Sequence, residues 1–331
     1  MLWIRGVTPG HLRSFFRNLS RCEVWLLTCL AALGLALVPL ASLIAQDSPG
    51  TTAQDGPAAD QQSIKELQAR LCSQTDLDCT YVTSIFSDPR LEVYHAPPPA
   101  PEEPPPNNRK EREKNPYLTR RFGLLTAESL DRCRRFTRAH SSAFTAAFKR
   151  YGVPREIICG HLRIETNFGI PTRLSPHPLG MRPAFNQLVS LYVKAQEPDS
   201  DRRREFAFAE ISQFIAAAKK FNWDLFGIPG SPTGAIGLVQ FEPSSFGVAV
   251  DAAGDGRVDL FDPDDAILSV AHYLVTRGWD RNPEHQRRAI YAYYGGHYDH
   301  DPHKYYMKAV LRYAMEVRGR PQHRARPRTG F

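Results

Sequence analysis

The stretch of sequence that decides the fold is REIICGHLRIETNFG, residues 155–169. Pro154 precedes it and suits the first turn of a helix, because the backbone N–H that proline lacks has no helical partner there. Gly169 suits the other end, because helices commonly stop at a glycine in the left-handed conformation. The segment therefore predicts a helix that begins at Pro154 and ends at Gly169.

The apolar residues of this segment are expected to form one buried face of the helix, with a carboxylate at its end. Glu165 directly follows the apolar positions. Apolar neighbours disfavour the charged form of a carboxyl group, and a glycosidase general acid has to hold a proton near neutral pH. Taken alone, the pattern fits a surface glutamate better. The apolar positions are Ile157, Ile158, Leu162 and Ile164.

A second motif, GSPTGAIGLVQFEPSSF at residues 230–246, has the residue types of a sugar-binding groove. Gly234, Ala235 and Gly237 permit close approach of the backbone, as the floor of a groove for an extended chain requires. Gln240 offers both a donor and an acceptor, which suits hydroxyl and acetamido groups.

The rest of the globular part, from Tyr117 to about Val317, shows helical spacing of apolar residues and no strand alternation longer than a few residues. Thr126 is a candidate N-cap for one helix that continues to the turn at Gly152. A mainly α-helical fold is expected. Further helical patterns cover residues 201–221, 262–278, 285–294 and 304–318.

The N-terminal segment indicates export. An uncharged apolar run covers residues 24–45 and follows several arginines. It is long enough to cross a bilayer core of about 30 Å, and the positive-inside rule places the remainder of the chain outside the cytoplasm. An uncleaved anchor and a signal cleaved near Ala45 both remain open. The segments are 1–45 (signal or anchor), 46–60 (flexible spacer), 61–94 (small helical segment), 95–116 (Pro-rich linker), 117–318 (globular domain) and 319–331 (basic tail).

Six cysteines and a net charge of +7 fit an exported protein with an anionic partner. Cys72 and Cys79 are expected to form a short-loop disulfide. Cys133 and Cys159 either join two helices or remain free buried thiols. Nucleic acid is a poor candidate partner, because the basic residues gather at the termini and export separates the chain from it.

Together these segments resemble the membrane-bound lytic transglycosylase B family, over most of the chain from about Tyr117 onward. The resemblance implies a lysozyme-like, mainly α-helical catalytic domain in which Glu165 is the single catalytic acid/base, and it points to Ser231 and Gln240 as groove residues. The matching motifs are YGVP-EII (151–158), ETNFG (165–169), GAIG-VQF-PSSF (234–246) and D-GDG-DLFDP-DAI-SVA-Y with a following GW (251–279).

The implied reaction is non-hydrolytic cleavage of peptidoglycan in the periplasm. Glu165 protonates the oxygen between N-acetylmuramic acid and N-acetylglucosamine, and the resulting carboxylate takes the proton of the C6 hydroxyl as a 1,6-anhydro ring closes. Water is not consumed, so neither the second carboxylate of most glycosidases nor a cofactor is required.

The motif that begins at Asp251 suggests a structural Ca²⁺ site of the EF-hand type. Its acidic residues fall at the ligand positions of such a loop, but Ala253 stands at position 3 and contributes no side-chain ligand. The alternative is a metal-free loop held by bonds between aspartates and the backbone. The candidate ligands are Asp251, Asp255, Arg257 (through its carbonyl), Asp262 and Asp265.

Tyrosines near the C-terminus match residues that, in this family, lie near the scissile bond. Tyr293 and Tyr306 match two such aromatics, and Tyr117 is a further candidate. Tyr294 stands where the family has asparagine, and the loop before Tyr306 is longer than usual. Ordinary helix packing is the alternative role for these tyrosines.

Two other functions remain open at this point. A hydrolytic muramidase requires a positioned water and normally a second acid. A catalytically weak peptidoglycan-binding or scaffold module tethered at the membrane is favoured by Ala253 and Tyr294, but it has no need of an acid at position 165. The protein partners of such a module are not identifiable from the sequence.

Overall fold

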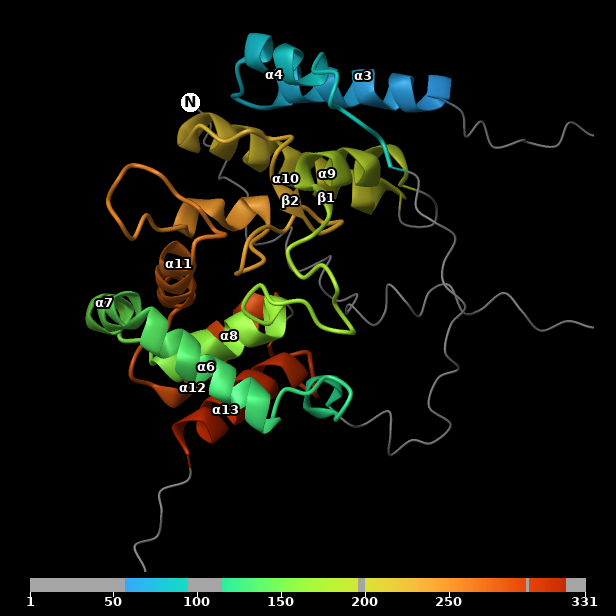
Figure 1. Ribbon diagram of the computed structural model, residues 1–331. Coiled ribbons are helices and arrows are strands. Elements are labelled where there is room, and N and C mark those ends of the chain that lie inside the picture. The colour runs from blue at the N-terminus through green and yellow to red at the C-terminus, as the bar shows by residue number, and fades with distance from the viewer. Residues whose placement is uncertain (1–56, 95–114, 196–199, 296–297, 320–331) are drawn as a thin grey trace, which may run out of the picture.

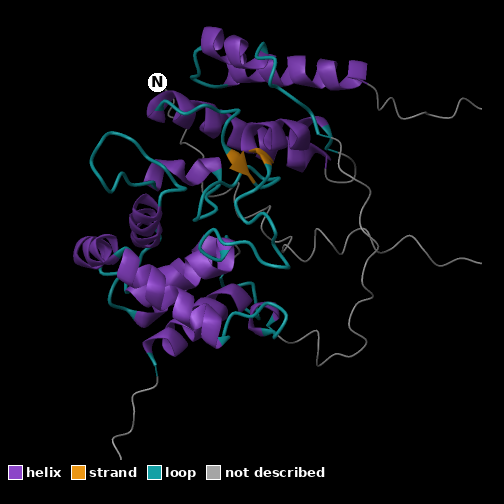
Figure 2. Ribbon diagram, viewed as in Figure 1, coloured by secondary structure: helices purple, strands orange, loops and turns teal. Residues whose placement is uncertain are grey.

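The computed structural model describes residues 57–94, 115–195, 200–295 and 298–319. Within these ranges the protein is mainly helical, as expected, and its strands are the two-residue segments β1 and β2, which pair antiparallel (Figure 2). The elements are α3 (Pro57–Gln74), α4 (Cys79–Phe86), the 3-10 helix η1 (Pro116–Leu118), α6 (Ala127–Ala139), α7 (Ser141–Tyr151), α8 (Arg155–Thr166), β1 (Arg182–Pro183), α9 (Ala184–Val193), α10 (Ser200–Phe221), β2 (Pro229–Gly230), the 3-10 helix η2 (Pro243–Val248), α11 (Pro263–Thr276), α12 (Pro283–Tyr294) and α13 (Tyr305–Arg318).

Helix α8 is the central helix of the part that also contains α6, α7, α12 and α13 (Figure 1). Every residue from Glu156 to Ile164 is buried, the polar ones included. The expectation of a single buried face is therefore wrong: α8 is enclosed on all sides, so its polar side chains need partners inside the protein.

Helix α8 ends three residues earlier than the sequence predicts. Asn167 and Phe168 adopt left-handed φ angles of 54° and 59°, before Gly169 at 75°. A phenylalanine rarely adopts this conformation. The ring of Phe168 is buried and lies 4.9 Å from that of Phe136, and burial of this size offsets a strain of about 1–2 kcal/mol.

The single helix expected from Thr126 to Gly152 is two helices, α6 and α7. Thr126 does cap α6, with its side chain accepting from the N–H of Ser129. The chain then bends at His140, whose φ and ψ are −113° and 37° and whose ring contacts the Asp264 carboxylate at 2.8 Å. The bend leaves Phe148 58% exposed, so this residue does not belong to the core.

A close contact sets the spacing between α8 and α13. Gly160 lies against Val310 so tightly that an added Cβ would lie 3.0 Å from the Cγ1 atom of Val310 and 3.3 Å from its carbonyl oxygen. A larger residue at position 160 would require Val310 to shift by at least a few tenths of an ångström.

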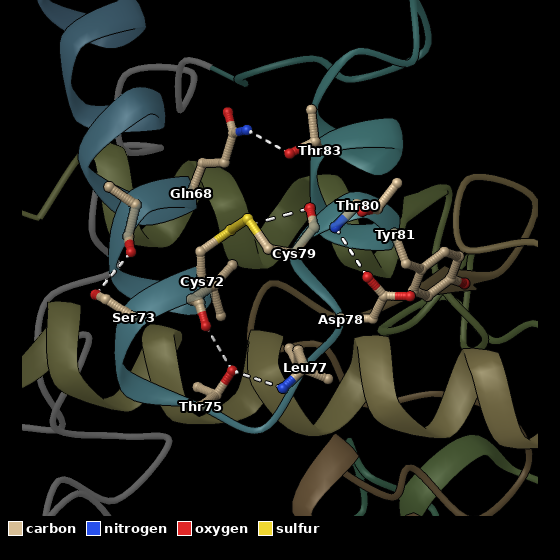
Figure 3. The surroundings of a disulfide bond; sticks show 12 residues. Gln68, Cys72, Ser73, Thr75, Leu77, Asp78, Cys79, Thr80, Tyr81 and Thr83 are labelled. Carbon is tan, nitrogen blue, oxygen red and sulfur yellow. Dashed lines mark hydrogen bonds between the residues drawn. A yellow bond between two sulfur atoms is a disulfide. The ribbon is translucent and has the colours of Figure 1, made fainter.

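The segment at residues 61–94, expected to be helical, contains α4 and most of α3, which begins at Pro57 within the predicted spacer. These helices lie over α9 and α10 at one end of the molecule (Figure 1). Leu67 and Leu71 of α3 are fully buried there. The Cys72–Cys79 disulfide joins the end of α3 to the start of α4, as Figure 3 shows, and confirms that predicted pair.

The second predicted disulfide is also confirmed. Cys133 of α6 bonds to Cys159 of α8, and both residues are buried. The alternative of free thiols is wrong. The bond ties α6 to the helix that carries Glu165.

Among the described residues, no helix is both long and apolar enough to cross a membrane. The apolar run at 24–45 lies outside the described residues, as do spacer residues 46–56, linker residues 95–114 and tail residues 320–331.

Candidate functional site

Glu165 lies in the last turn of α8 and is half-buried. Its Oε1 atom accepts a hydrogen bond of 2.7 Å from the hydroxyl of Tyr306, on the neighbouring helix α13. Burial, followed by the negative charge of Glu165, raises the pKa of Tyr306 well above its usual value. Tyr306 therefore stays protonated and acts as a hydrogen-bond donor to the carboxyl group.

The four tyrosines predicted as site residues come together around this bond. The Tyr306 ring stacks on that of Tyr294, with centroids 5.5 Å apart, and lies parallel to that of Tyr293 at 6.3 Å. The Tyr117 ring meets Tyr306 edge-on at 5.9 Å. Tyr294, at the position where asparagine was expected, is thus part of the aromatic group beside Glu165.

Two hydrogen bonds hold the glycine-rich loop against the same region. The hydroxyl of Thr166, the residue after Glu165, donates to the carbonyl of Leu238 at 2.9 Å. The hydroxyl of Tyr293 donates to the carbonyl of Val239 at 2.7 Å. Gln240 follows directly, in the left-handed conformation with φ 50°. The end of α8 and the loop that carries Gln240 are therefore fixed to each other.

The glycines of this loop make their close approaches to the protein itself. A Cβ at Gly234 would lie 2.4 Å from the Leu188 side chain, and one at Gly237 would lie 2.3 Å from the carbonyl oxygen of Leu260. Both residues also have positive φ. Their absent side chains let the loop pack into the core, which differs from the groove floor expected from the sequence.

Ser231 lies at the beginning of the loop. Its hydroxyl accepts from the N–H groups of Thr233 and Ala235, at 3.3 and 3.1 Å. The hydrogen bonds described for Ser231 are thus within its own turn.

Two buried polar residues of α8 belong to the site and were missed in the sequence. His161 is fully buried, and its Nδ1 atom lies 2.8 Å from the hydroxyl of Tyr306. Arg163 donates to Ser129 Oγ at 2.7 Å and to the carbonyls of Phe122 and Gly123 at 3.1 Å. The segment that follows Tyr117 is thereby held against α8.

The available signal was the spacing of these residues. His161 precedes Glu165 by four positions, so the two share a face of the helix.

Burial lowers the pKa of His161 to about 3, so its ring is neutral at physiological pH.

The predicted calcium ligands form a loop beside α11, and its carboxylates are used by the backbone. Asp251 accepts from the N–H groups of residues 254–256. Asp265 accepts from Ala252 and Asp259 at 2.7 Å. Asp262 caps α11, and Asp255 accepts from the N–H of Arg257 at 2.9 Å.

This arrangement does not fit a bound Ca²⁺. No group of three or more acidic, histidine or cysteine side chains in the described ranges is placed to hold a metal ion, and position 3 is Ala253. Burial raises the pKa of Asp265, partly offset by its backbone hydrogen bonds. The contacts described within this loop are bonds from aspartates to the backbone.

A family model described as the transglycosylase SLT domain matches residues 59–322. The chain belongs to this family. The family resemblance expected from the motifs is confirmed, and the match extends to α3 and α4, N-terminal to the region where the resemblance was first seen.

A curated relative of this transglycosylase-domain chain is membrane-bound lytic murein transglycosylase B of Escherichia coli K12. The two are 36% identical over 145 residues, which are 44% of this chain and 37% of the relative. The match thus spans little more than a third of the length of that relative.

Two solved structures share the fold of this protein. The E. coli lytic transglycosylase SLT35, in complex with calcium, aligns with a TM-score of 0.56 and 21% identity, over 77% of this chain and 92% of that one. Pseudomonas aeruginosa SltB3, in complex with NAG-anhNAM-pentapeptide, aligns with a TM-score of 0.58 and 18% identity, over 78% and 80%.

Proposed function

We propose that this protein is a lytic transglycosylase that cleaves the bond between N-acetylmuramic acid and N-acetylglucosamine in peptidoglycan. The observation that carries the proposal is the half-buried carboxyl group of Glu165, held by Tyr306 within a transglycosylase SLT domain. The name of the E. coli relative supports the reaction, and the muropeptide bound to SltB3 supports the substrate class.

In the proposed mechanism, one carboxyl group moves two protons in sequence. Protonated Glu165 gives its proton to the oxygen of the scissile bond as that bond breaks. The Glu165 carboxylate then takes the proton of the C6 hydroxyl while this oxygen bonds to the anomeric carbon, which closes the anhydro ring. The hydrogen bond from Tyr306 becomes stronger while Glu165 is ionised, because bonds to charged acceptors are stronger than neutral ones.

The sugar-binding residues are proposals of the same kind. Gln240 offers an amide to hydroxyl or acetamido groups, and Ser231, at the beginning of the same loop, offers a hydroxyl. Within the tyrosine cluster, Tyr117 and Tyr294 are partly exposed and offer aromatic surface near the acid, whereas Tyr293 and Tyr306 are buried. These residues are expected to affect KM more than Glu165 does.

The proposed location is the periplasm. The apolar run at residues 24–45 either anchors the chain in the inner membrane or is removed after export, and the name of the E. coli relative favours the anchor. No cofactor is required for the proposed reaction, and no Ca²⁺ takes part in it.

The decisive experiment compares Glu165→Gln with Glu156→Gln. Both glutamates are on α8, but Glu156 lies at its other end and pairs with Arg155 at 3.3 Å. Glu165→Gln should lower turnover of purified sacculi at least about 100-fold, the usual contribution of a general acid. Glu156→Gln should keep near-normal activity, and circular dichroism should show that both variants are folded.

Mass spectrometry of the released fragments tests the reaction type. Anhydromuramic ends are expected. Reducing muramic ends would show a hydrolase instead, and a folded native chain that binds sacculi but releases nothing would show a scaffold module.

A further inference from the structure

A hydrogen-bonded chain of three side chains runs from the core to Glu165. His161 Nδ1 lies 2.8 Å from the hydroxyl of Tyr306, and this hydroxyl lies 2.7 Å from Glu165 Oε1. His161 is 0% exposed and Tyr306 2% exposed, so bulk water does not compete for these bonds. The chain is therefore a fixed part of the interior that ends at the acid.

Hydrogen-bond counting sets the direction of this chain. A phenol has one proton, and Tyr306 donates it to Glu165. The Tyr306 oxygen must then accept from His161, so we assign the proton of the neutral imidazole to Nδ1. The other ring nitrogen, Nε2, is buried with no partner among the described residues. A proton on Nε2 would leave a buried donor unpaired, which is costly.

The surrounding rings prevent the chain from rearranging. The His161 ring lies 4.3 Å from that of Tyr293 and 5.6 Å from that of Tyr306. Tyr306 is in turn enclosed by Tyr294 and Tyr117. With its ring fixed, the direction of the Tyr306 O–H bond depends on which neighbour accepts its proton and which neighbour donates to its oxygen.

We propose that His161 is a positioning residue for the reaction proposed above: by donating to Tyr306, it directs the Tyr306 proton to Oε1 of Glu165. The acidic proton of Glu165 is then carried on Oε2 in every cycle. After that proton leaves, Tyr306 holds the carboxylate in place until the C6 hydroxyl proton arrives. No proton passes along the chain, and His161 and Tyr306 end the cycle as they began it.

The test uses two substitutions of His161 in the full-length protein. His161→Leu fills the space but donates nothing. His161→Asn places an amide N–H close to the position of Nδ1. We expect His161→Leu to lower kcat on sacculi about 10-fold with little change in KM, and we expect His161→Asn to recover most of that loss. Equal losses in both variants, with both folded, would overturn the proposal.

A double-mutant cycle separates positioning from a general structural role. In a Tyr306→Phe background the chain is already broken, so His161→Leu should cause no further loss of kcat. If His161 only supports packing, the two losses multiply, and this result would also overturn the proposal.

The tautomer of His161 can be measured without enzyme turnover, so it tests this inference separately from the proposed function. The ¹⁵N shifts of the His161 ring in the native protein should show a neutral Nδ1–H tautomer at neutral pH. The Nε2–H tautomer would refute the positioning role of His161 even in an active enzyme. An Nδ1–H tautomer in a protein that releases no glycan fragments would instead refute the transglycosylase function and leave the assigned hydrogen-bond direction intact.

Discussion

The two disulfides should contribute unequally to stability, and the lengths of their loops give the sizes. Cys133 and Cys159 are 26 residues apart, whereas Cys72 and Cys79 are 7 apart. The chain-entropy relation gives about 3.5 kcal/mol for the longer loop and about 2.4 kcal/mol for the shorter one. Packing adds to this difference in stability, because Cys133 and Cys159 are buried whereas Cys79 is exposed.

The test replaces both cysteines of each pair with alanine and measures unfolding in urea by circular dichroism. With a denaturant slope of about 3 kcal/mol per M, the midpoint should fall by about 1.2 M without Cys133–Cys159 and by about 0.8 M without Cys72–Cys79. The deciding observation is which of the two disulfides lowers the urea midpoint more when it is removed. An equal or larger effect from the exposed pair would refute the reasoning from loop length and burial.

Three further predictions concern the glycine-rich loop, the buried histidine and the acidic loop. Gly237→Ala should lower the free energy of unfolding in urea by at least about 2 kcal/mol more than Gly254→Ala does. Both glycines have positive φ, but only Gly237 lies against backbone atoms. Equal losses of stability in the two variants would contradict this reasoning. Because the pKa of His161 is about 3 when folded and about 6.5 when unfolded, the unfolded chain binds more protons between these values. The free energy of unfolding should therefore fall by up to about 1.4 kcal/mol per pH unit as the pH drops below 6.5. His161→Asn keeps a donor to Tyr306 but does not titrate, so this part of the pH dependence should be absent when its urea midpoints at two pH values are compared with those of the native protein. Ala253→Asp supplies the missing position-3 ligand of the acidic loop. Calcium at about five times its Kd should raise the Tm of this variant by about 2–4 °C, while the Tm of the native protein changes by less than about 1 °C. A similar rise of Tm in both proteins would show that the native loop binds the ion.

Much of the fold was predictable because it depends on local signals. The helix at residues 201–221, the cap at Thr126 and the Cys72–Cys79 disulfide follow from spacing and residue type, and the structure bears them out. For Cys133 and Cys159 the sequence left two alternatives, and the structure shows the disulfide. The bend at His140 was not predictable, because RAHS contains neither glycine nor proline. It depends on a contact with Asp264, more than a hundred positions away in the chain.

The candidate site shows the same division. Motif order brought Glu165 and the tyrosines into one hypothesis, and the contacts of Tyr306 unite them. The part played by His161 required the position of α13, which no local pattern contains. The glycines at 234 and 237 were expected to form a groove floor, whereas their close neighbours are Leu188 and Leu260 of the protein itself.

The contact at Gly160 bears on the position of Tyr306 relative to Glu165. Val310 lies one turn from Tyr306 on α13, and Gly160 precedes His161 on α8. A methyl group added at position 160 would meet Val310 at 3.0 Å, so the start of α13 would have to adjust by a few tenths of an ångström. The single hydrogen atom of Gly160 thereby helps to keep the phenol within bonding distance of the carboxyl group.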